Sequence, residues 1–358
     1  MKQRRLWFGL AMTALLGILT PVLLMAAPPE PVTTSNNSVP VLCYHRVLAT
    51  PLSAYDFAPS QLEQHFKYLK DNGYQTLTAV QFLELQKKHR RIPGKSIVLT
   101  FDDGHHSHYT EVFPLLKKYG FVATFFVVPQ VIAENSTTQL TWNELNEMAT
   151  AGMDIQSHTM NHPFLTSIKD GGGEANYLKW LENELKGSKT LIEGKLHRPV
   201  TVLAYPYGWY NETVENMAVK AGYEGMHTVN WGVNEAGANP LRVRRRVMEN
   251  TMGLSDLERI VNIKPLRIRI VSPADIAIVK QPPLIQFKIL DPGISNVEIQ
   301  VRNYRMKLDP DLQGVYHFGG ITELKPGYCM IIITGFDAEG RRYVTSWGFD
   351  YQKPDTPQ

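Results

Sequence analysis

Between Val39 and about Val261, short apolar runs alternate with amphipathic helical patterns. Such alternation predicts strands that are joined by crossover helices, and therefore a parallel sheet or a β/α barrel. Gly73 and Gly222 stand where helices would end, and Ser60 and Asn211 where two would begin. The expected strands are 39–44, 96–101, 121–128 and 153–156, and the expected helices are 60–72, 141–150, 175–196 and 211–221.

The pattern changes near Lys264-Pro265, beyond which helical periods disappear and short strands separated by turn residues follow one another. Several short strands at regular spacing predict a small all-β sandwich of immunoglobulin-like type. We therefore expect two folded domains, residues 39–263 and residues 264–358. The strands expected in the second domain are 266–271, 284–290, 296–301, 328–334 and 344–349.

The N-terminus has the composition of an export segment. Lys2, Arg4 and Arg5 precede an uncharged apolar stretch at 6–27, which is long enough to span a bilayer. We expect residues 1–27 to act as a signal peptide or as an N-terminal membrane anchor, with cleavage slightly favoured, and residues 28–38 to form a linker. The protein is thus expected outside the cytoplasm, secreted or anchored in the cell envelope.

Charge and cysteine content exclude several classes of protein. The net charge of +3 equals the contribution of the three basic residues in the export segment, so the remaining chain is close to neutral. This balance argues against a nucleic-acid partner. The two cysteines, Cys43 and Cys329, rule out a disulfide scaffold, and their positions in different expected domains favour two free buried thiols.

Two adjacent carboxylates end the apolar run Ile97–Phe101. Asp102 and Asp103 come directly after it and are followed by Gly104. In β/α folds, active sites lie at the carboxyl ends of the strands. Because neighbouring side chains of a strand point to opposite sides, one carboxylate could bind a metal while the other remains near the attacking water. Alone, however, Asp-Asp-Gly is more typical of a turn.

Two histidines follow the strand expected at 153–156. His158 and His162 are four residues apart, which would place them on one face if the segment formed a helical turn. Alone, this pair is only suggestive. Together with one Asp it supplies three protein ligands and leaves a position for water, as in catalytic metal sites.

A third motif, Tyr205-Pro206-Tyr207-Gly208-Trp209, follows a short expected strand. A Pro-Tyr-Gly loop can present a backbone N–H to an oxyanion. The aromatic rings of Tyr205, Tyr207 and Trp209 could pack against sugar faces, and the competing interpretation is an aromatic corner of the core.

In this order, TFDDG, SHTMNH and AYPYG resemble the motifs of the polysaccharide deacetylases of carbohydrate esterase family 4. The resemblance covers about residues 39–261. It implies a distorted (β/α) barrel and a divalent metal ion, with Zn2+ preferred over Co2+, Ni2+ or Mn2+. It further implies removal of N-acetyl groups from N-acetylglucosamine units of a polysaccharide, by a protein that we expect to be monomeric.

The resemblance also implies a role for each motif residue. Asp103, His158 and His162 would be the metal ligands, and Asp102 would be the general base. The backbone N–H of Tyr207 would help to hold the oxyanion.

Two further roles in the family are less well marked in this sequence. The general acid often comes from a late Leu-x-His motif, of which Met226-His227 is the nearest trace. The run Leu42-Cys43-Tyr44-His45 resembles a subgroup that acts on poly-β-1,6-N-acetylglucosamine, in which an early Tyr-His supplies the acid. We therefore prefer His45 to His227.

The family usually pairs an arginine with the base, which keeps that carboxylate ionised. The segment 240–248 carries the candidates, among which Arg245 is preferred to Arg244 and Arg242. His105, His106 and His108 depart from the family pattern. They are interpreted as residues of a surface loop, and the alternative is that they line the cleft or add a metal contact.

Two other functions compete with deacetylation. A glycoside hydrolase needs two carboxyl groups on either side of the scissile bond, and adjacent Asp102 and Asp103 fit this need poorly. A catalytically inactive polysaccharide-binding or scaffold protein is the second alternative, although all the expected metal and base residues are present.

Overall fold

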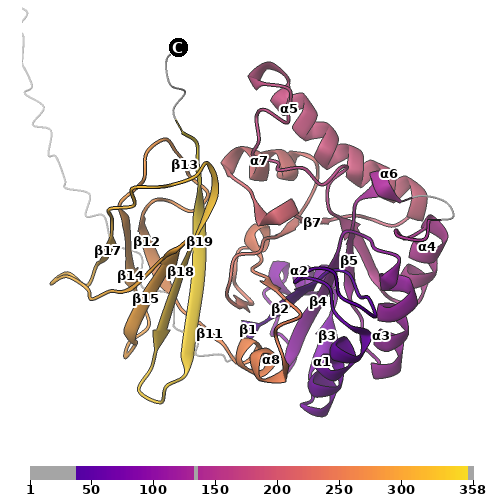
Figure 1. Cartoon of the computed structure of the whole chain (residues 1–358), viewed down its shortest axis with the longest axis horizontal. Helices are drawn as coiled ribbons and strands as arrows, with labels where there is room; N and C mark the ends of the chain where they lie inside the picture. Colours follow the sequence, from indigo (N-terminus) through magenta and orange to yellow (C-terminus); the bar gives the residue numbers. More distant parts are fainter. Residues whose placement is uncertain (1–37, 133–135, 354–358) are drawn as a thin grey trace, which may run out of the picture. The chain divides into compact units, whose positions relative to one another are not determined.

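The computed structural model describes residues 38–132 and 136–353. A parallel sheet forms the centre of their first part, residues 38–261, which we call the α/β region (Figure 1). Its strand order is β10-β2-β4-β5-β6-β7-β8, and β3 also pairs with β4. The strands are β2 (Val41–Tyr44), β3 (Gln75–Leu77), β4 (Ser96–Asp102), β5 (Thr124–Val127), β6 (Asp154–Ser157), β7 (Val202–Ala204), β8 (Gly225–His227) and β10 (Arg246–Val247).

The sheet is curled, because the segment 243–247 runs beside both of its ends. Val243 forms a parallel bridge with His227 of β8, while Arg246 in β10 pairs with Leu42 of β2. Arg245 lies between these two pairings. The helices of the region are α1 (Pro59–Asp71), α2 (Ala79–Lys87), α3 (Phe113–Tyr119), α4 (Trp142–Thr150), α5 (Glu174–Glu182), α6 (Ser188–Leu196), α7 (Glu212–Lys220) and α8 (Leu254–Val261).

This arrangement confirms the predicted α/β parallel architecture and fixes where a site can form. Strand β4 is buried along its whole length, so its apolar residues pack on both sides of the sheet. Strands β2, β4, β6 and β7 run parallel, and their carboxyl ends therefore meet at one edge. The polar residues that follow these strands gather at that edge.

The second part of the chain, residues 264–353, is all-β and forms several sheets, which we call the β region. One sheet has the order β11-β19-β18-β15-β16 with β13 beside β19, and a second has the order β12-β14-β17. An immunoglobulin-like topology stays a prediction. The strands are β11 (Lys264–Pro265), β12 (Ile268–Ser272), β13 (Ile278–Val279), β14 (Ile285–Ile289), β15 (Ser295–Val301), β16 (Tyr304–Lys307), β17 (Tyr316–Phe318), β18 (Gly327–Phe336) and β19 (Arg342–Tyr351).

Buried hydrogen bonds join the two regions. Asn211, the N-cap of α7, donates from Nδ2 to Asp350 of β19 at 3.0 Å, and the Tyr328 hydroxyl donates to Asn230 at 2.9 Å. The described residues all belong to one compact unit. The expected boundary between residues 263 and 264 coincides with the change from helices to strands, and its status as a domain boundary stays a prediction.

The expected export segment, residues 1–27, lies outside the described residues, as does the expected linker apart from Ser38, which begins β1 (Ser38–Val39). In the described part of the chain, no helix combines the length and the apolar character needed to cross a bilayer.

Candidate active site

The carboxyl edge of the sheet brings the expected site residues together. Asp102 is the last residue of β4, and Asp103 follows it with a positive φ of 77°. His45 follows β2 and His158 follows β6. They line one cavity of about 510 Å³.

Asp103, His158 and His162 form a compact set of metal-ligand atoms, with one atom from each residue within 4.8 Å of the others. Nε2 of His162 lies 3.4 Å from Oδ1 of Asp103 and 3.1 Å from Nε2 of His158. Nδ1 of His158 lies 2.8 Å from the Ala204 carbonyl oxygen, which can only accept a hydrogen bond. The proton therefore resides on Nδ1, and Nε2 presents its lone pair to the set. One carboxylate and two imidazoles in this arrangement fit a divalent metal ion.

The segment between the two histidines is not the helical turn that their spacing predicted. Thr159 has a φ of 68° and His162 a φ of 59°, and neither lies in a helix. Positive φ is costly for residues with a Cβ atom and is concentrated at functional sites. The two rings nevertheless meet, with their centroids 4.6 Å apart.

Glu184, which the sequence analysis did not select, holds this segment in place. Its buried carboxylate accepts hydrogen bonds from the backbone N–H of Asn161 at 2.9 Å and from the Asn161 side chain at 2.7 Å. Its own carbonyl accepts from the Met160 N–H. Glu184 lies in a π-helical turn (Asn183–Gly187) that interrupts the helix expected at 175–196. Such turns often mark functional positions, but their sequences carry no clear signal.

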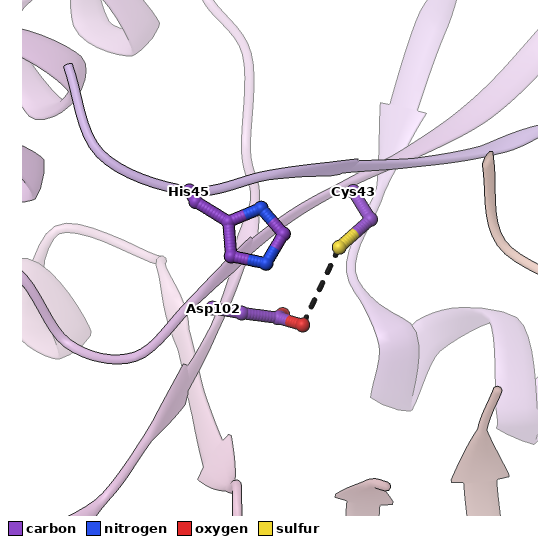
Figure 2. Close-up of side chains that lie close together, drawn as sticks. All are labelled: Cys43, His45 and Asp102. Carbon is purple, nitrogen blue, oxygen red and sulfur yellow. Dashed lines mark hydrogen bonds between the residues drawn. The ribbon is translucent and has the colours of Figure 1, made fainter. Parts of the chain in front are cut away.

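Asp102 lies beside the ligand set, with its Oδ2 at 3.7 Å from Nε2 of His158, and is only 2% exposed. Its Oδ1 accepts a hydrogen bond from Arg245 at 2.7 Å, and its Oδ2 accepts one from the thiol of Cys43 at 3.3 Å. Figure 2 shows this thiol and the ring of His45 beside the carboxylate. Burial is the largest single influence and would raise the pKa of Asp102. The charge and the hydrogen bond of Arg245, together with His158 and His45, outweigh it, so this pKa lies well below its usual value.

Of the three candidate arginines, the structure places Arg245 against the base. Arg245 is 1% exposed and also donates from Nε to the Thr228 carbonyl at 2.9 Å. Arg242 instead pairs with Glu215 and Asp275, and Arg244 donates to the Ser346 carbonyl.

The two candidate acids occupy different surroundings. His45 lines the cavity beside Asp102, and its pKa is lowered by burial while the nearby carboxylates oppose that shift. His227 is 2% exposed, packs on Phe126 with ring centroids 5.2 Å apart, and is not among the residues that line the cavity. Burial lowers its pKa far below the usual value.

The aromatic residues of the third motif also differ in exposure and packing. Tyr207 is 48% exposed, stacks on Phe164 at 3.9 Å and lies against His162. Trp209 also contacts Phe164, with ring centroids 4.6 Å apart, and is half-buried. Tyr205 is fully buried and stacks on Tyr210 at 4.8 Å, so its ring has no free face for a sugar.

The interpretation of His105, His106 and His108 as residues of a surface loop is wrong. His108 is fully buried, and its Nε2 donates to the His45 carbonyl at 2.9 Å. Nε2 of His105 lies 3.3 Å from Oδ2 of Asp103. His106 contacts Glu144 at the start of α4. His105 and His108 thus contact the strand ends that carry the site, which is nearer to the alternative of a place in the cleft.

Comparisons with known proteins agree with this geometry. Residues 89–226 match the family model of polysaccharide deacetylases. A Bacillus subtilis protein named as a polysaccharide deacetylase, YxkH, is 33% identical over 192 residues, which cover 54% of this chain and 64% of that relative. The match therefore spans less than two thirds of that relative's length. The poly-β-1,6-N-acetyl-D-glucosamine N-deacetylase of Staphylococcus aureus is 27% identical and is covered over 73% of its length, again by 54% of this chain.

The solved structure of the Streptococcus pyogenes deacetylase PplD in complex with acetate superimposes with a TM-score of 0.57 at 27% identity. The superimposed part covers 63% of this chain and 98% of the PplD chain. The residues that match the family model, 89–226, lie within the α/β region. The α/β region of this chain is therefore similar in sequence and in fold to the polysaccharide deacetylases.

Proposed function

We propose that this protein hydrolyses the N-acetyl groups of N-acetylglucosamine units in an extracellular or cell-envelope polysaccharide. The observation that carries the proposal is that a metal-ligand set and a candidate general base lie side by side at one edge of the sheet. Asp103, His158 and His162 form a metal-ligand set, and a buried, ionised Asp102 lies against it, with its Oδ2 at 3.7 Å from Nε2 of His158.

The ligand set is proposed to hold a divalent ion, with Zn2+ preferred because two imidazoles and one carboxylate suit it. Such an ion supplies Lewis acidity to the amide carbonyl and lowers the pKa of a coordinated water. The Ala204 carbonyl fixes the tautomer of His158, and Glu184 fixes the segment that carries His162. These contacts hold the ligand atoms in place before substrate arrives.

Asp102 would act as the general base that takes the proton of the attacking water, because Arg245 keeps its carboxylate ionised. His45 would then protonate the nitrogen of the leaving amine, which separates from acetate. Its place in the cavity supports this role, whereas the burial of His227 against Phe126 does not. The Tyr207 backbone N–H would stabilise the oxyanion.

The exposed ring of Tyr207 and the half-buried ring of Trp209 are proposed to contact the sugar faces. Poly-β-1,6-linked N-acetylglucosamine is the first polymer to test, because a relative carries that substrate in its name. Residues 1–27 would deliver the protein, as a monomer, to the outside of the membrane.

Acetate release from N-acetylglucosamine oligomers tests the proposal. The purified protein is incubated with the oligomers as prepared, after chelation and after Zn2+ is restored, and the chain length of each product is measured. The proposal predicts acetate without chain shortening, loss of this activity on chelation, and recovery with metal. Shortened chains would indicate a glycoside hydrolase, and the absence of any product would leave the binding alternative.

A further inference from the structure

Strand β18 carries apolar side chains on both of its faces. Cys329, Ile331 and Ile333 belong to the core of the β region. The alternate residues Met330 and Ile332 point the other way and line the cavity that contains Asp102 and the ligand set. The β region therefore supplies one wall of the candidate active site.

A second cavity of about 270 Å³ continues from this wall. Both cavities are lined by Tyr207, Val229, Met330 and Ile332, so they adjoin. The residues that line only the second cavity include Trp209 from the α/β region and two polar residues of the β region, Gln300 in β15 and Arg302 directly after that strand.

The second cavity is built around Trp209. A Cβ atom at Gly327, which has a φ of 109°, would lie 2.3 Å from the indole ring. Only glycine therefore allows the first residue of β18 to pass beneath Trp209 in this conformation. The Trp209 ring therefore packs against the β region, although it belongs to a motif of the α/β region.

Arg302 is oriented by its own hydrogen bonds. It donates from Nε to Sγ of Cys329 at 3.3 Å and from one Nη to the Tyr328 carbonyl at 2.9 Å. Its second Nη has no hydrogen-bond partner among the described residues. Gln300 in β15 is exposed beside it. A cavity lined by an aromatic ring, an amide and a guanidinium suits a pyranose, which has apolar faces and polar edges.

We propose that this second cavity is a subsite for the sugar unit that adjoins the unit undergoing deacetylation. The inference rests on the proposed function and extends it, because it makes the β region part of the substrate-binding surface. The enzyme would then favour polymers over single sugars, since a longer chain fills both cavities and a short one fills only the first.

Kinetics on oligomers of increasing length test the subsite. The measured quantity is the ratio of two values of kcat/KM for deacetylation, that for a long oligomer divided by that for the shortest oligomer that is deacetylated. Arg302→Ala is expected to lower this ratio roughly tenfold, the effect of losing one hydrogen bond from a charged donor. Arg269→Ala is the matched control, because Arg269 is exposed on β12 and lies in neither cavity. An unchanged ratio in Arg302→Ala would overturn the proposal.

Gln300→Ala guards against a folding defect, because the Gln300 side chain is exposed and forms no hydrogen bond within the described residues. It should lower the same ratio in the same direction, and a correctly folded variant with a normal ratio would count against the subsite.

Failure of the subsite differs from failure of the proposed function. If the unmodified protein releases acetate while the variants keep its length preference, only the subsite is wrong. If it releases none, the proposed function is wrong, and calorimetric binding of the same oligomers decides the subsite. Equal dissociation constants for the unmodified protein and Arg302→Ala, or no binding to either, would then overturn it.

Discussion

Replacing Arg245 with alanine removes the positive charge that faces Asp102 in the buried base pair. The two side chains are 1% and 2% exposed, and the ion pair measures 2.7 Å, so little water can take over the role of the guanidinium. Removal of one partner from a buried ion pair costs about 3–5 kcal/mol, because the remaining charge is left uncompensated. We expect Arg245→Ala to lose about this much unfolding free energy at neutral pH.

The pH dependence of this loss has a definite sign. In the unmodified protein the pKa of Asp102 is depressed. The pair therefore stabilises the fold above the unfolded-state pKa of about 3.9, and this stability disappears as pH falls through the folded-state pKa. Without Arg245, burial is opposed by fewer groups, so we expect the pKa of Asp102 to rise. The destabilisation is then complete above that raised pKa, and it diminishes as pH falls through it.

Denaturant unfolding of the two proteins at several pH values measures this effect, with metal content held equal. The acid limb of the kcat/KM profile should move to higher pH in Arg245→Ala, because the base is protonated earlier. Arg245→Lys is the control, since it keeps the charge but loses the hydrogen bond from Nε to the Thr228 carbonyl. Equal stability and an unmoved acid limb in Arg245→Ala would refute the argument.

Three further predictions concern individual residues of the site. His162→Ala should lose bound metal and activity together, as measured by elemental analysis and acetate release, and an unchanged metal content would show that His162 is not a ligand. Asp102→Asn should keep its metal but lose about 10²–10⁴-fold in kcat, the usual contribution of a general base; near-normal turnover would mean that another group is the base. Glu184→Gln should weaken metal binding about 10–100-fold in a competition titration with a chelator, as loss of an outer-shell contact does, whereas Glu182→Gln, on the exposed surface nearby, should not.

Much of the site was predictable because strand ends meet in a parallel sheet. Asp102, Asp103 and His158 end or follow apolar runs, and that position alone places them at one edge. The arginine that pairs with Asp102 was harder to predict, because the segment 242–245 contains three candidates. Only the curl of the sheet, which puts this segment between β8 and β2, selects Arg245.

Other features depended on contacts that a sequence pattern does not encode. The segment 158–162 reaches its shape through positive φ at residues with side chains, where helical spacing is the natural expectation. Glu184 accepts a hydrogen bond from Asn161, which lies 23 positions earlier in the sequence. It does so from a π-helical turn within a segment whose pattern predicts one continuous helix. Helix α1 begins with Ala58 as N-cap and Pro59 inside it, so the prediction of Ser60 as N-cap is wrong, while Asn211 caps α7 as predicted.

Hydrolysis in heavy-oxygen water most directly tests whether this site cleaves the N-acetyl bond. The metal-loaded protein is incubated with an intact N-acetylglucosamine oligomer in the labelled water, and Asp102→Asn is treated in parallel. The masses of the products are then measured by mass spectrometry. The account predicts acetate that carries one heavy oxygen, an oligomer of unchanged length with a free amine, and little of either product from Asp102→Asn. Heavy oxygen at a new reducing end of a shortened oligomer, or equal acetate from Asp102→Asn, would contradict it.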